Sequence, residues 1–281
     1  MNSRVDRYAV VGNPIAHSRS PEIHRLFAKE TRQAISYERL EAPLNGFEEF
    51  ALGLRDAGYL GLNVTIPFKL DAAKLADELL PRARLAGAVN TLKFDGDTII
   101  GDNTDGIGFV RDVQHRLKFQ IRDASVLILG AGGGVRGLIG ALLEERPRWI
   151  AVANRTHGRA EELADEFGVE AIRFDEIPAE HFDLVINGTA SSLNQDAPKI
   201  DPESFDDCTL AYDLVYANAP TAFMRLAQQG GAQHVSDGLG MLIEQAAESF
   251  ALWRGVRPHC APVYRELRRM LELEHAAASA R

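Results

Sequence analysis

A short stretch of the chain places polar side chains where a ligand could meet them. From Leu60 to Ile66 apolar residues alternate with small or polar ones, which is typical of a β-strand with one buried face. Asn63 and Thr65 share the other face, because alternate side chains of a strand project together. Pro67 then ends the strand, since it has no N–H to donate, and Lys69 follows. An amide, a hydroxyl and an ammonium group in this order predict directed hydrogen bonds to a polar ligand.

A glycine-rich turn in the second half of the chain is typical of a phosphate-binding site. It directly follows the apolar stretch Val126–Leu129 and precedes a helical pattern from Val135 to Glu145. In that setting a phosphate can approach the backbone N–H groups at a helix N-terminus. Val135 stands where the usual fingerprint has its third glycine, and a plain strand-to-helix turn is the alternative. The candidate residues are Gly130, Ala131, Gly132, Gly133 and Gly134.

The end of the next predicted strand carries basic and polar residues in place of an acid. Sites that prefer NAD have Asp or Glu here, which binds the ribose 2′-OH, whereas the first carboxylate of this segment is Glu161. Guanidinium groups match phosphate oxygens well, so the segment favours NADP with its 2′-phosphate. A solvent-exposed helix cap at Thr156 is the alternative. The candidate residues are Asn154, Arg155, Thr156, His157, Gly158 and Arg159.

Four further stretches are more polar than their predicted structure needs, and each also has an ordinary structural explanation. Ser20 before Pro21 is a good N-cap with proline at the first helical position. Asn90 could close a turn, and Asp105 before a glycine could cap a helix. Gln245 lies off the apolar stripe of its predicted helix, so we expect solvent exposure there by default.

The composition limits the classes of function. Of the 281 residues 46% are hydrophobic and 25% are charged, which is ordinary for a globular protein. The net charge of −9 without a basic block argues against nucleic-acid binding, so local donors must hold any anionic ligand. Cys208 and Cys260 are far apart and in no metal-ligand spacing, which favours a reducing compartment and no zinc site. No stretch has the pattern of a signal peptide or a membrane span, so we expect a cytoplasmic protein.

Strand-like and helix-like patterns alternate along almost the whole chain. This alternation predicts an α/β fold with largely parallel sheets. The predicted strands cover residues 8–11, 35–40, 60–66, 98–100, 125–129, 149–153, 184–187 and 210–214. The predicted helices cover residues 21–30, 46–56, 68–79, 159–167, 221–229 and 239–253. A boundary between two domains is expected in the turn at residues 102–108.

Seven motifs together resemble the shikimate dehydrogenase family, in this order and at family spacing. They are GNPIAHSxSP, NVTxPFK, AGAVNT, GDNTDG, GAGGxxRG, NRT and DGLGMLxxQAA, and they extend from Val10 to the helix that holds Gln245. The resemblance implies two α/β domains, an N-terminal substrate-binding domain with a mostly parallel sheet and a Rossmann-like NADP-binding domain. We expect these to be residues 1–105 and 106–240, with C-terminal helices in residues 241–281 that return to the substrate domain.

The resemblance also implies an activity, the reversible reduction of 3-dehydroshikimate to shikimate with NADPH, in aromatic amino-acid biosynthesis by way of chorismate. A redox alcohol needs one group that moves a proton while hydride leaves, and Lys69 is that group. An ordinary lysine is protonated at neutral pH, so we assign the role to Lys69 and Asp105 as a coupled pair. The expected partners are the substrate and NADP, with no metal, nucleic acid or membrane. The chain is expected to be a monomer or a homodimer.

Carried over residue by residue, the resemblance gives a substrate site rich in hydrogen-bonding groups. Ser18 and Ser20 would bind the substrate carboxylate, and Tyr216 would lie near it. A polyhydroxylated acid also needs many directed donors and acceptors around its ring. The residues that would line the ring hydroxyls are Asn63, Thr65, Lys69, Asn90, Asp105 and Gln245.

The same resemblance gives a cofactor site in the second half of the chain. The glycine turn Gly130–Gly134 and the segment Asn154–Arg159 would hold the pyrophosphate and the 2′-phosphate of NADP. Leu214 and Gly238 would lie near the nicotinamide ring.

Three other functions share part of this pattern. A quinate or dual quinate/shikimate dehydrogenase has the same fold and chemistry, although the paired serines Ser18 and Ser20 favour shikimate in the resemblance. A regulatory sensor of quinate use would be expected to lack Lys69 or Asp105 or to carry an added DNA-binding segment. Both residues are present, and no stretch is expected to form such a segment. A bare NADP-binding module like that of glutamyl-tRNA reductases explains the glycine turn but not the first hundred residues.

Overall fold

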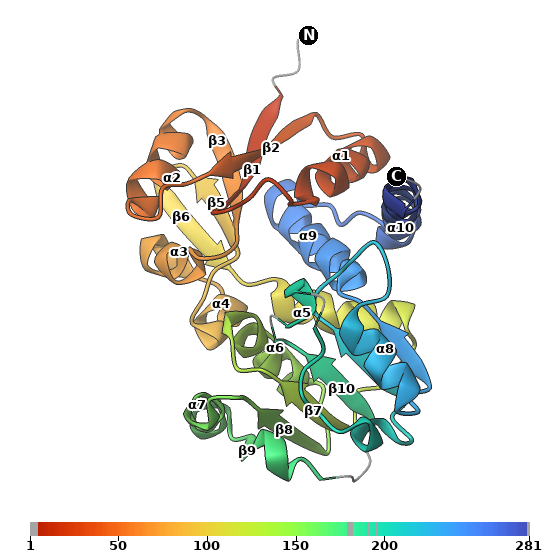
Figure 1. Cartoon of the computed structure of the whole chain (residues 1–281). Coiled ribbons are helices and arrows are strands. Elements are labelled where there is room, and N and C mark those ends of the chain that lie inside the picture. Colours follow the sequence, from red (N-terminus) through yellow and green to blue (C-terminus); the bar gives the residue numbers. More distant parts are fainter. Residues whose placement is uncertain (1–4, 179–181, 190, 195, 280–281) are drawn as a thin grey trace. The chain divides into compact units, whose positions relative to one another are not determined.

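The structure is a computed structural model that describes residues 5–178, 182–189, 191–194 and 196–279. It divides into two compact units, each with its own sheet (Figure 1). The first unit comprises the chain up to Gly108 together with Ile243–Tyr264, and the second comprises Phe109–Leu242 and Arg265–Arg281. The domain boundaries expected from the sequence stay a prediction. The expected fold class, two α/β units with mostly parallel sheets, is confirmed.

The first unit is built on a six-stranded mixed sheet with the order β2-β1-β3-β5-β6-β4. The strands are β1 (Asp6–Gly12), β2 (Ile35–Glu41), β3 (Tyr59–Val64), β4 (Glu78–Leu79), β5 (Thr91–Asp95) and β6 (Thr98–Asp102). β1 is parallel to β2 and β3, and β4 is parallel to β6, whereas β5 is antiparallel to both of its neighbours. The carboxyl ends of the parallel strands β1, β2 and β3 therefore lie on the same side of the sheet, where ligands of such sheets bind.

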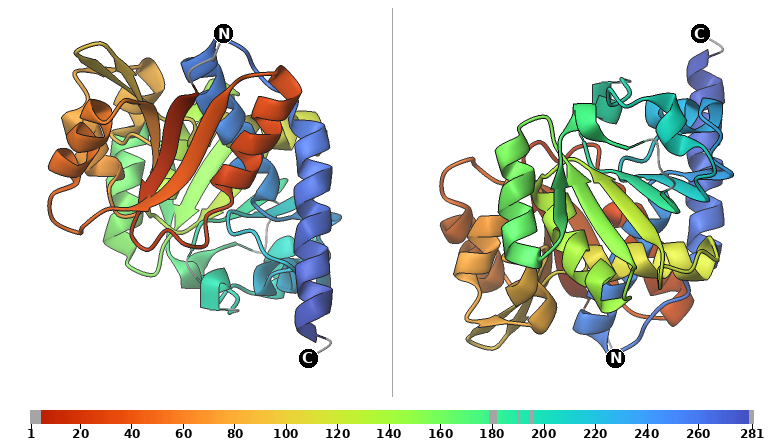
Figure 2. Two further views of the ribbon diagram at one scale, coloured as in Figure 1. Left: turned by 90° about the horizontal axis from the view of Figure 1, so that it is seen from above. Right: turned by 90° about the horizontal axis from the view of Figure 1, so that it is seen from below.

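Helices cover both faces of this sheet. The helices of this unit are α1 (Ser20–Thr31), α2 (Phe47–Asp56), α3 (Lys69–Leu75) and α4 (Pro81–Ala86), together with the start of α5 (Asp105–Arg111), most of α9 (Leu239–Arg254) and the first residues of α10 (Cys260–Ser279). On one face α2 and α3 pack against Ala9 and Leu62 (Figure 1). On the other face lie α1, next to β2 in Figure 2, and residues 243–254 of α9. An aromatic layer forms there, in which Tyr8 stacks on Trp253 at 4.6 Å between ring centroids.

The sequence prediction differs from the structure at two places near the site. The strand predicted to reach Ile66 ends at Val64, so the expected strand end is wrong, and Ile66 lies in a turn with 72% of its surface exposed. The helix predicted for residues 68–79 is shorter and begins at Lys69, because the residues after it pair with β6 as β4. The prediction also missed β5, which forms a hairpin with β6 through Gly96, whose φ is +61°.

The second unit is built on a six-stranded parallel sheet with the order β12-β11-β10-β7-β8-β9. The strands are β7 (Ser125–Leu129), β8 (Trp149–Ala153), β9 (Glu170–Ile172), β10 (Leu184–Asn187), β11 (Leu210–Asp213) and β12 (His234–Ser236). Counted along the chain, this is the 3-2-1-4-5-6 order of Rossmann folds. In such sheets ligands bind where the strand order reverses, which here is between β7 and β10.

Both faces of this parallel sheet are buried. The helices are α6 (Gly133–Glu144), α7 (His157–Phe167), α8 (Ala222–Gln229) and the C-terminal part of α10, with a π-helix at Asp112–Arg116. Val126 and Ile128 of β7 pack in one core layer with residues of α6 and α7. Leu127 and Leu129 pack in the opposite layer with Phe223 of α8. Burial on both faces explains why β7 is a continuous apolar run.

Candidate active site

A lysine and an aspartate face each other just beyond the ends of β3 and β6. Lys69 begins α3, Asp105 begins α5, and Lys69 Nζ donates to Asp105 Oδ2 over 2.5 Å. Their side chains are 24% and 11% exposed. The N–H of Asp105 donates to Asn103 Oδ1, which fixes the first turn of α5. An ammonium and a carboxylate at this distance can exchange a proton with each other and with a bound hydroxyl group.

The side-chain amide of Asn90 orients the aspartate. It is 3% exposed, and its Nδ2 donates to Asp105 Oδ1 over 2.9 Å, which leaves the other oxygen to the lysine. Its Oδ1 accepts from Thr104 N and from Thr91 Oγ1, both at 2.9 Å. Gln245 Oε1 lies 3.4 Å from the same Nδ2. The expected solvent exposure of Gln245 is therefore wrong: it is 9% exposed, because its side chain turns into this polar cluster.

Asn63, near the end of β3, is hydrogen-bonded on both sides of its amide. Its Oδ1 accepts from Tyr37 OH over 2.7 Å. Its Nδ2 lies 2.9 Å from Ser249 Oγ, 3.1 Å from Thr91 Oγ1 and 3.3 Å from Asn90 O. Both amide hydrogens are thus used within the protein, and the second lone pair of Oδ1 is what Asn63 can offer to a ligand. A ligand hydroxyl that donates a hydrogen bond fits this position.

Ser18 and Ser20 lie together at the start of α1. Ser18 Oγ donates to Ser20 Oγ over 3.2 Å and accepts from Ser20 N over 3.3 Å. Arg39 fixes this loop, because its Nε donates to Ser18 O over 2.6 Å while its guanidinium pairs with Glu22. Two hydroxyls at a helix N-terminus suit a carboxylate. Thr65 lies in the turn after β3, where its N–H donates to the backbone of β1.

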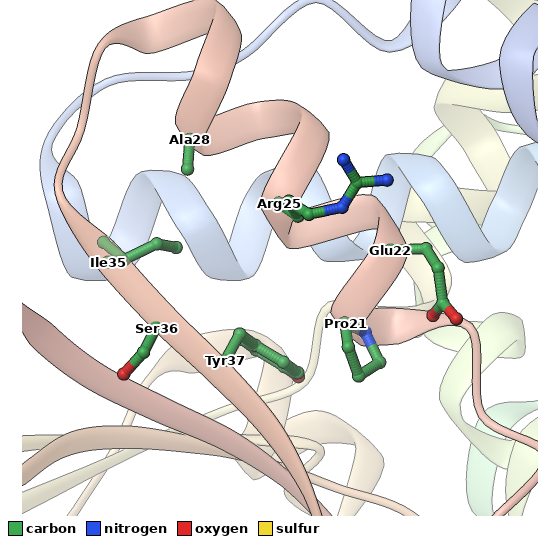
Figure 3. A pocket seen from close by; sticks show the side chains of 7 residues that line it. All are labelled: Pro21, Glu22, Arg25, Ala28, Ile35, Ser36 and Tyr37. Carbon is green, nitrogen blue, oxygen red and sulfur yellow. The ribbon is translucent and has the colours of Figure 1, made fainter.

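Tyr37 connects the serines with Asn63. Its hydroxyl is also hydrogen-bonded to the Ser20 side chain, and burial raises the pKa of Tyr37 well above its usual value. Its ring lines a pocket of about 370 Å³, in which Figure 3 shows it projecting from β2 toward Pro21. The lining residues are Pro21, Glu22, Arg25, Ala28, Ile35, Ser36 and Tyr37. The tyrosine therefore has its ring in this pocket and its hydroxyl in the polar cluster.

His24 supports Tyr37 from the aromatic layer as a neutral ring. The two rings are stacked, with 4.1 Å between centroids and 6° between planes. His24 is fully buried, and among the described residues neither ring nitrogen has a hydrogen-bond partner. Burial lowers the pKa of His24 to about 3, although the neighbouring Asn63 amide opposes the shift.

A cluster of charges fixes the end of β6. Arg82 of α4 pairs with Asp102, which is fully buried, and with Glu248 of α9 over 3.2 Å. Arg257 pairs with Glu248 over 2.8 Å. The carbonyl of Asp102 accepts from the N–H of Asn90, so the ion pairs and the amide position the same segment.

Four residues of this cluster were missed from the sequence, namely Tyr37, Thr91, Thr104 and Ser249. Thr91 directly follows Asn90 and lies inside the AGAVNT motif. Ser249 follows Gln245 by one helical turn, which places both on one face of α9, and this spacing could have revealed it. Thr104 lies inside the GDNTDG motif and could have been included with it. Tyr37 has no such signal, because it bonds across the sheet from β2 to β3 with β1 between them.

In the second unit the glycine turn leads from β7 into α6. Gly130 has a φ of +102°, and a Cβ there would lie 3.0 Å from the Gly188 carbonyl oxygen, so this position requires glycine. A Cβ at Gly132, Gly133 or Gly134 would meet open space within the described part of the chain. The open start of α6 gives a phosphate access to its N–H groups, and the residues present therefore fit a dinucleotide.

The segment after β8 forms the start of α7. Asn154 Nδ2 donates to Thr156 O over 2.8 Å, which closes the turn before His157, the first residue of the helix. Arg155 and Arg159 are exposed. Two exposed guanidinium groups beside a helix N-terminus fit a phosphate group.

The loops after β11 and β12 lie backbone to backbone. Gly238 N donates to Val215 O over 3.2 Å, and a Cβ at Gly238 would collide with the Leu214 carbonyl. Asp213, fully buried, accepts from three side chains and from Val215 N, which fixes the start of the first loop. Tyr216 follows in this loop and is partly buried.

Within the first unit the structure brings most of the predicted site residues together. Hydrogen bonds join Lys69, Asp105, Asn90, Gln245 and Asn63 in the first unit, and link Ser18, Ser20 and Tyr37 there. Over the described ranges no helix could span a membrane, and no group of three or more His, Cys, Asp or Glu side chains could hold a metal ion.

Three family models match the chain. They are described as the shikimate dehydrogenase substrate binding domain, residues 10–92, shikimate / quinate 5-dehydrogenase, residues 112–199, and the shikimate 5′-dehydrogenase C-terminal domain, residues 238–268. These matches lie along most of the sequence.

Similar proteins bear related names. The shikimate dehydrogenase (NADP(+)) of Herminiimonas arsenicoxydans is 54% identical over 275 residues, which cover 96% of this chain and 100% of the relative. That of Janthinobacterium sp. (strain Marseille) is 51% identical, with 95% and 99% covered. The shikimate 5-dehydrogenase of Thermus thermophilus, solved in complex with NADP(H) and shikimate, has a TM-score of 0.87 at 34% identity, with 94% and 99% covered. An Ael1 enzyme from Pseudomonas putida has a TM-score of 0.90 at 43% identity, with 93% and 98% covered.

Replacing His24 with phenylalanine should make the protein more resistant to acid. The pKa of His24 is about 3 in the folded protein and about 6.5 in the unfolded chain. Between these two pH values unfolding therefore takes up a proton. The contribution of His24 to the free energy of unfolding is therefore fully present above about pH 6.5. It falls as the pH drops toward 3, by up to about 1.4 kcal/mol per pH unit. His24→Phe keeps the stacking on Tyr37 and removes this loss.

The measurement is the free energy of urea unfolding at a series of pH values between 7 and 4. His234→Gln, a change at an exposed histidine, is the control and should leave the profile of the unchanged protein. Equal acid sensitivity of the His24→Phe variant and the unchanged protein would refute the assignment.

Proposed function

The chain belongs to the shikimate dehydrogenase family, and on that premise we propose that it catalyses the reversible NADPH-dependent reduction of 3-dehydroshikimate to shikimate. The resemblance found in seven motifs is confirmed by the family matches and by the relatives named shikimate dehydrogenase (NADP(+)). The names of these relatives do not favour the broader quinate/shikimate alternative. The observation that carries the proposal is the Lys69–Asp105 pair, set among buried amide and hydroxyl groups. The reaction serves the biosynthesis of aromatic amino acids.

The substrate would be bound by groups that the first unit leaves available. The hydroxyls of Ser18 and Ser20 suit its carboxylate, because they lie together at the start of α1. The remaining lone pair of Asn63 Oδ1 suits a ring hydroxyl. We assign Asn90 mainly to orienting Asp105, since its own amide is already bonded within the protein. Thr65, Gln245 and Tyr216 stay proposed substrate contacts.

The proton would pass through the Lys69–Asp105 pair. In the reduction, Lys69 Nζ donates a proton to the ketone oxygen as hydride reaches the carbon, and in the oxidation the pair takes the hydroxyl proton back. Asp105 Oδ2 accepts from Lys69 Nζ and so orients it. Asn90 keeps the carboxylate in place through Oδ1.

NADP, when bound, supplies or accepts the hydride, and the second unit carries the groups that suit it. The pyrophosphate would lie against the open start of α6, at Gly132–Gly134. The exposed Arg155 and Arg159 would bind the 2′-phosphate. Leu214 and Gly238, which lie in contact, would border the nicotinamide.

The same proposal covers domains, assembly and location. We assign substrate binding to residues 1–105 and NADP binding to residues 106–240. The sequence places the helices of residues 241–281 with the substrate domain, and the structure groups Ile243–Tyr264 with the first unit and Arg265–Arg281 with the second. The family match named substrate binding domain, residues 10–92, supports the first assignment. We further propose a cytoplasmic monomer or homodimer that binds no nucleic acid, which its net charge of −9 supports.

The function is tested by following NADP reduction in an absorbance assay with shikimate and with quinate, each with NADP and with NAD. We expect turnover with shikimate and NADP to exceed every other combination clearly. Equal or higher kcat/KM with quinate would reject the specificity, and no turnover with either acid would reject the proposed reaction.

Lys69→Ala should lower kcat by roughly 10²–10⁴-fold with a smaller effect on KM, because a positioned acid–base group is lost. Asp105→Asn should also lower kcat. The double variant should lose less than the two single effects combined, since both act as one unit. Steady-state kinetics of the three variants measure this.

The matched control is Lys74→Ala, which removes a lysine of the same helix that pairs with Asp71 and is 79% exposed. It should keep kcat and KM. If Lys69→Ala kept kcat within a factor of about three and raised KM alone, Lys69 would be a binding residue.

Arg155→Asp should raise KM for NADP and improve the relative use of NAD, because a carboxylate repels the 2′-phosphate but can bind a 2′-OH. The ratio of kcat/KM with the two cofactors is the measurement. The control is Arg122→Asp, which makes the same charge change. Arg122 is exposed and precedes β7, whereas the glycine turn follows β7, so this variant should keep the ratio. An unchanged ratio in Arg155→Asp would place selectivity elsewhere.

A further inference from the structure

An arginine of the C-terminal helix bonds to the loop that carries Tyr216. Arg268 of α10 donates from Nη1 to Ala217 O over 3.2 Å and from Nη2 to Asp237 Oδ1 over 2.5 Å. The Arg268 side chain is 24% exposed and that of Asp237 is 4% exposed. A charge-assisted bond between such groups is strong, because little water competes for them.

Asp237 bonds to the same loop and to the start of α9. Its Oδ2 accepts from Ala217 N over 3.3 Å, so the arginine and the aspartate together bind both backbone groups of Ala217. Its Oδ1 also accepts from Leu239 N over 3.3 Å. We call Arg268 and Asp237 the clasp.

The clasp fixes the residue after Tyr216, and Gly238 fixes the residue before it. Val215 O accepts from Gly238 N over 3.2 Å, while both backbone groups of Ala217 are held by the clasp. Tyr216 is the residue between them. Its backbone is thus pinned before and after the side chain, and Arg268 supplies one of these bonds from outside every motif of the sequence.

We propose that Arg268 is a positioning residue that, together with Asp237, sets the side chain of Tyr216 for binding the substrate carboxylate. This rests on the proposed function, in which Tyr216 is a substrate contact. Arg268 acts through the loop, by its bonds to Ala217 and Asp237. Its loss lets Ala217 move and takes Tyr216 out of line with the carboxylate.

The experiment compares Arg268→Ala with Arg269→Ala, which removes the neighbouring arginine of α10, 60% exposed and paired with Glu266 on the same helix. We expect Arg268→Ala to raise KM for shikimate about tenfold or more, since small displacements of a binding group are costly. KM for NADP should change much less. Arg269→Ala should keep both constants, and Arg268→Lys should recover part of the loss.

A second comparison asks whether the effect passes through Tyr216. In a Tyr216→Ala background, Arg268→Ala should change KM for shikimate by less than about twofold. A full tenfold effect in that background, or equal effects of Arg268→Ala and Arg269→Ala, would overturn the proposal. So would equal losses in the binding of shikimate and NADP, which indicate a general loss of structure.

Amide hydrogen exchange tests the role of the clasp independently of the proposed reaction. Amides of residues 214–217 should exchange faster in Arg268→Ala than in Arg269→Ala, whatever the protein turns over. Faster exchange without any turnover of shikimate by the unchanged protein would reject the proposed function and keep the clasp. Unchanged exchange would reject the clasp itself.

Discussion

The buried amide of Asn90 is the group on which the polar site of the first unit depends. At 3% exposure it must find partners inside the protein, because an unpaired buried polar group costs about 1–3 kcal/mol. Its partners come from the start of β5, the loop after β6 and the start of α5. Satisfying one amide therefore fixes three segments, and the Asp105 oxygen that it leaves is the one that Lys69 reaches.

Local patterns predicted the elements and the residues whose placement depends on their neighbours in sequence. The strand before Lys69 and the turn after Leu129 could be read from the chain, because periodicity and glycine act within a few residues. The predicted end of the strand before Lys69 is too late, since Ile66 continues the alternation although β3 ends at Val64. Alternation reports which residues are apolar, and it does not report where the ladder of hydrogen bonds stops.

Contacts between distant segments lay beyond sequence reasoning. Gln245 was expected in solvent because it lies off the apolar stripe of α9, yet this part of the helix meets a polar cluster. The prediction from the apolar stripe assumes that the buried face of a helix is apolar. Here the helix packs against the polar side chain of Asn90, so a polar residue is buried. Tyr37 and Arg268 were missed for a related reason, since each bonds across elements that are separated in the chain.

The hydrogen bonds that the protein makes with itself also select what it can bind. The amide hydrogens of Asn63 are already used, so a ligand meets its Oδ1 atom, which accepts one hydrogen bond from Tyr37. It must then donate there, as a hydroxyl does. A carboxylate, in a chain of net charge −9, has to rely on local donors such as Ser18 and Ser20. An analogue without that hydroxyl would leave the second lone pair of Asn63 Oδ1 without a donor, in addition to any loss of apolar contact. The preference for a hydroxylated acid therefore follows from which groups the fold has already satisfied.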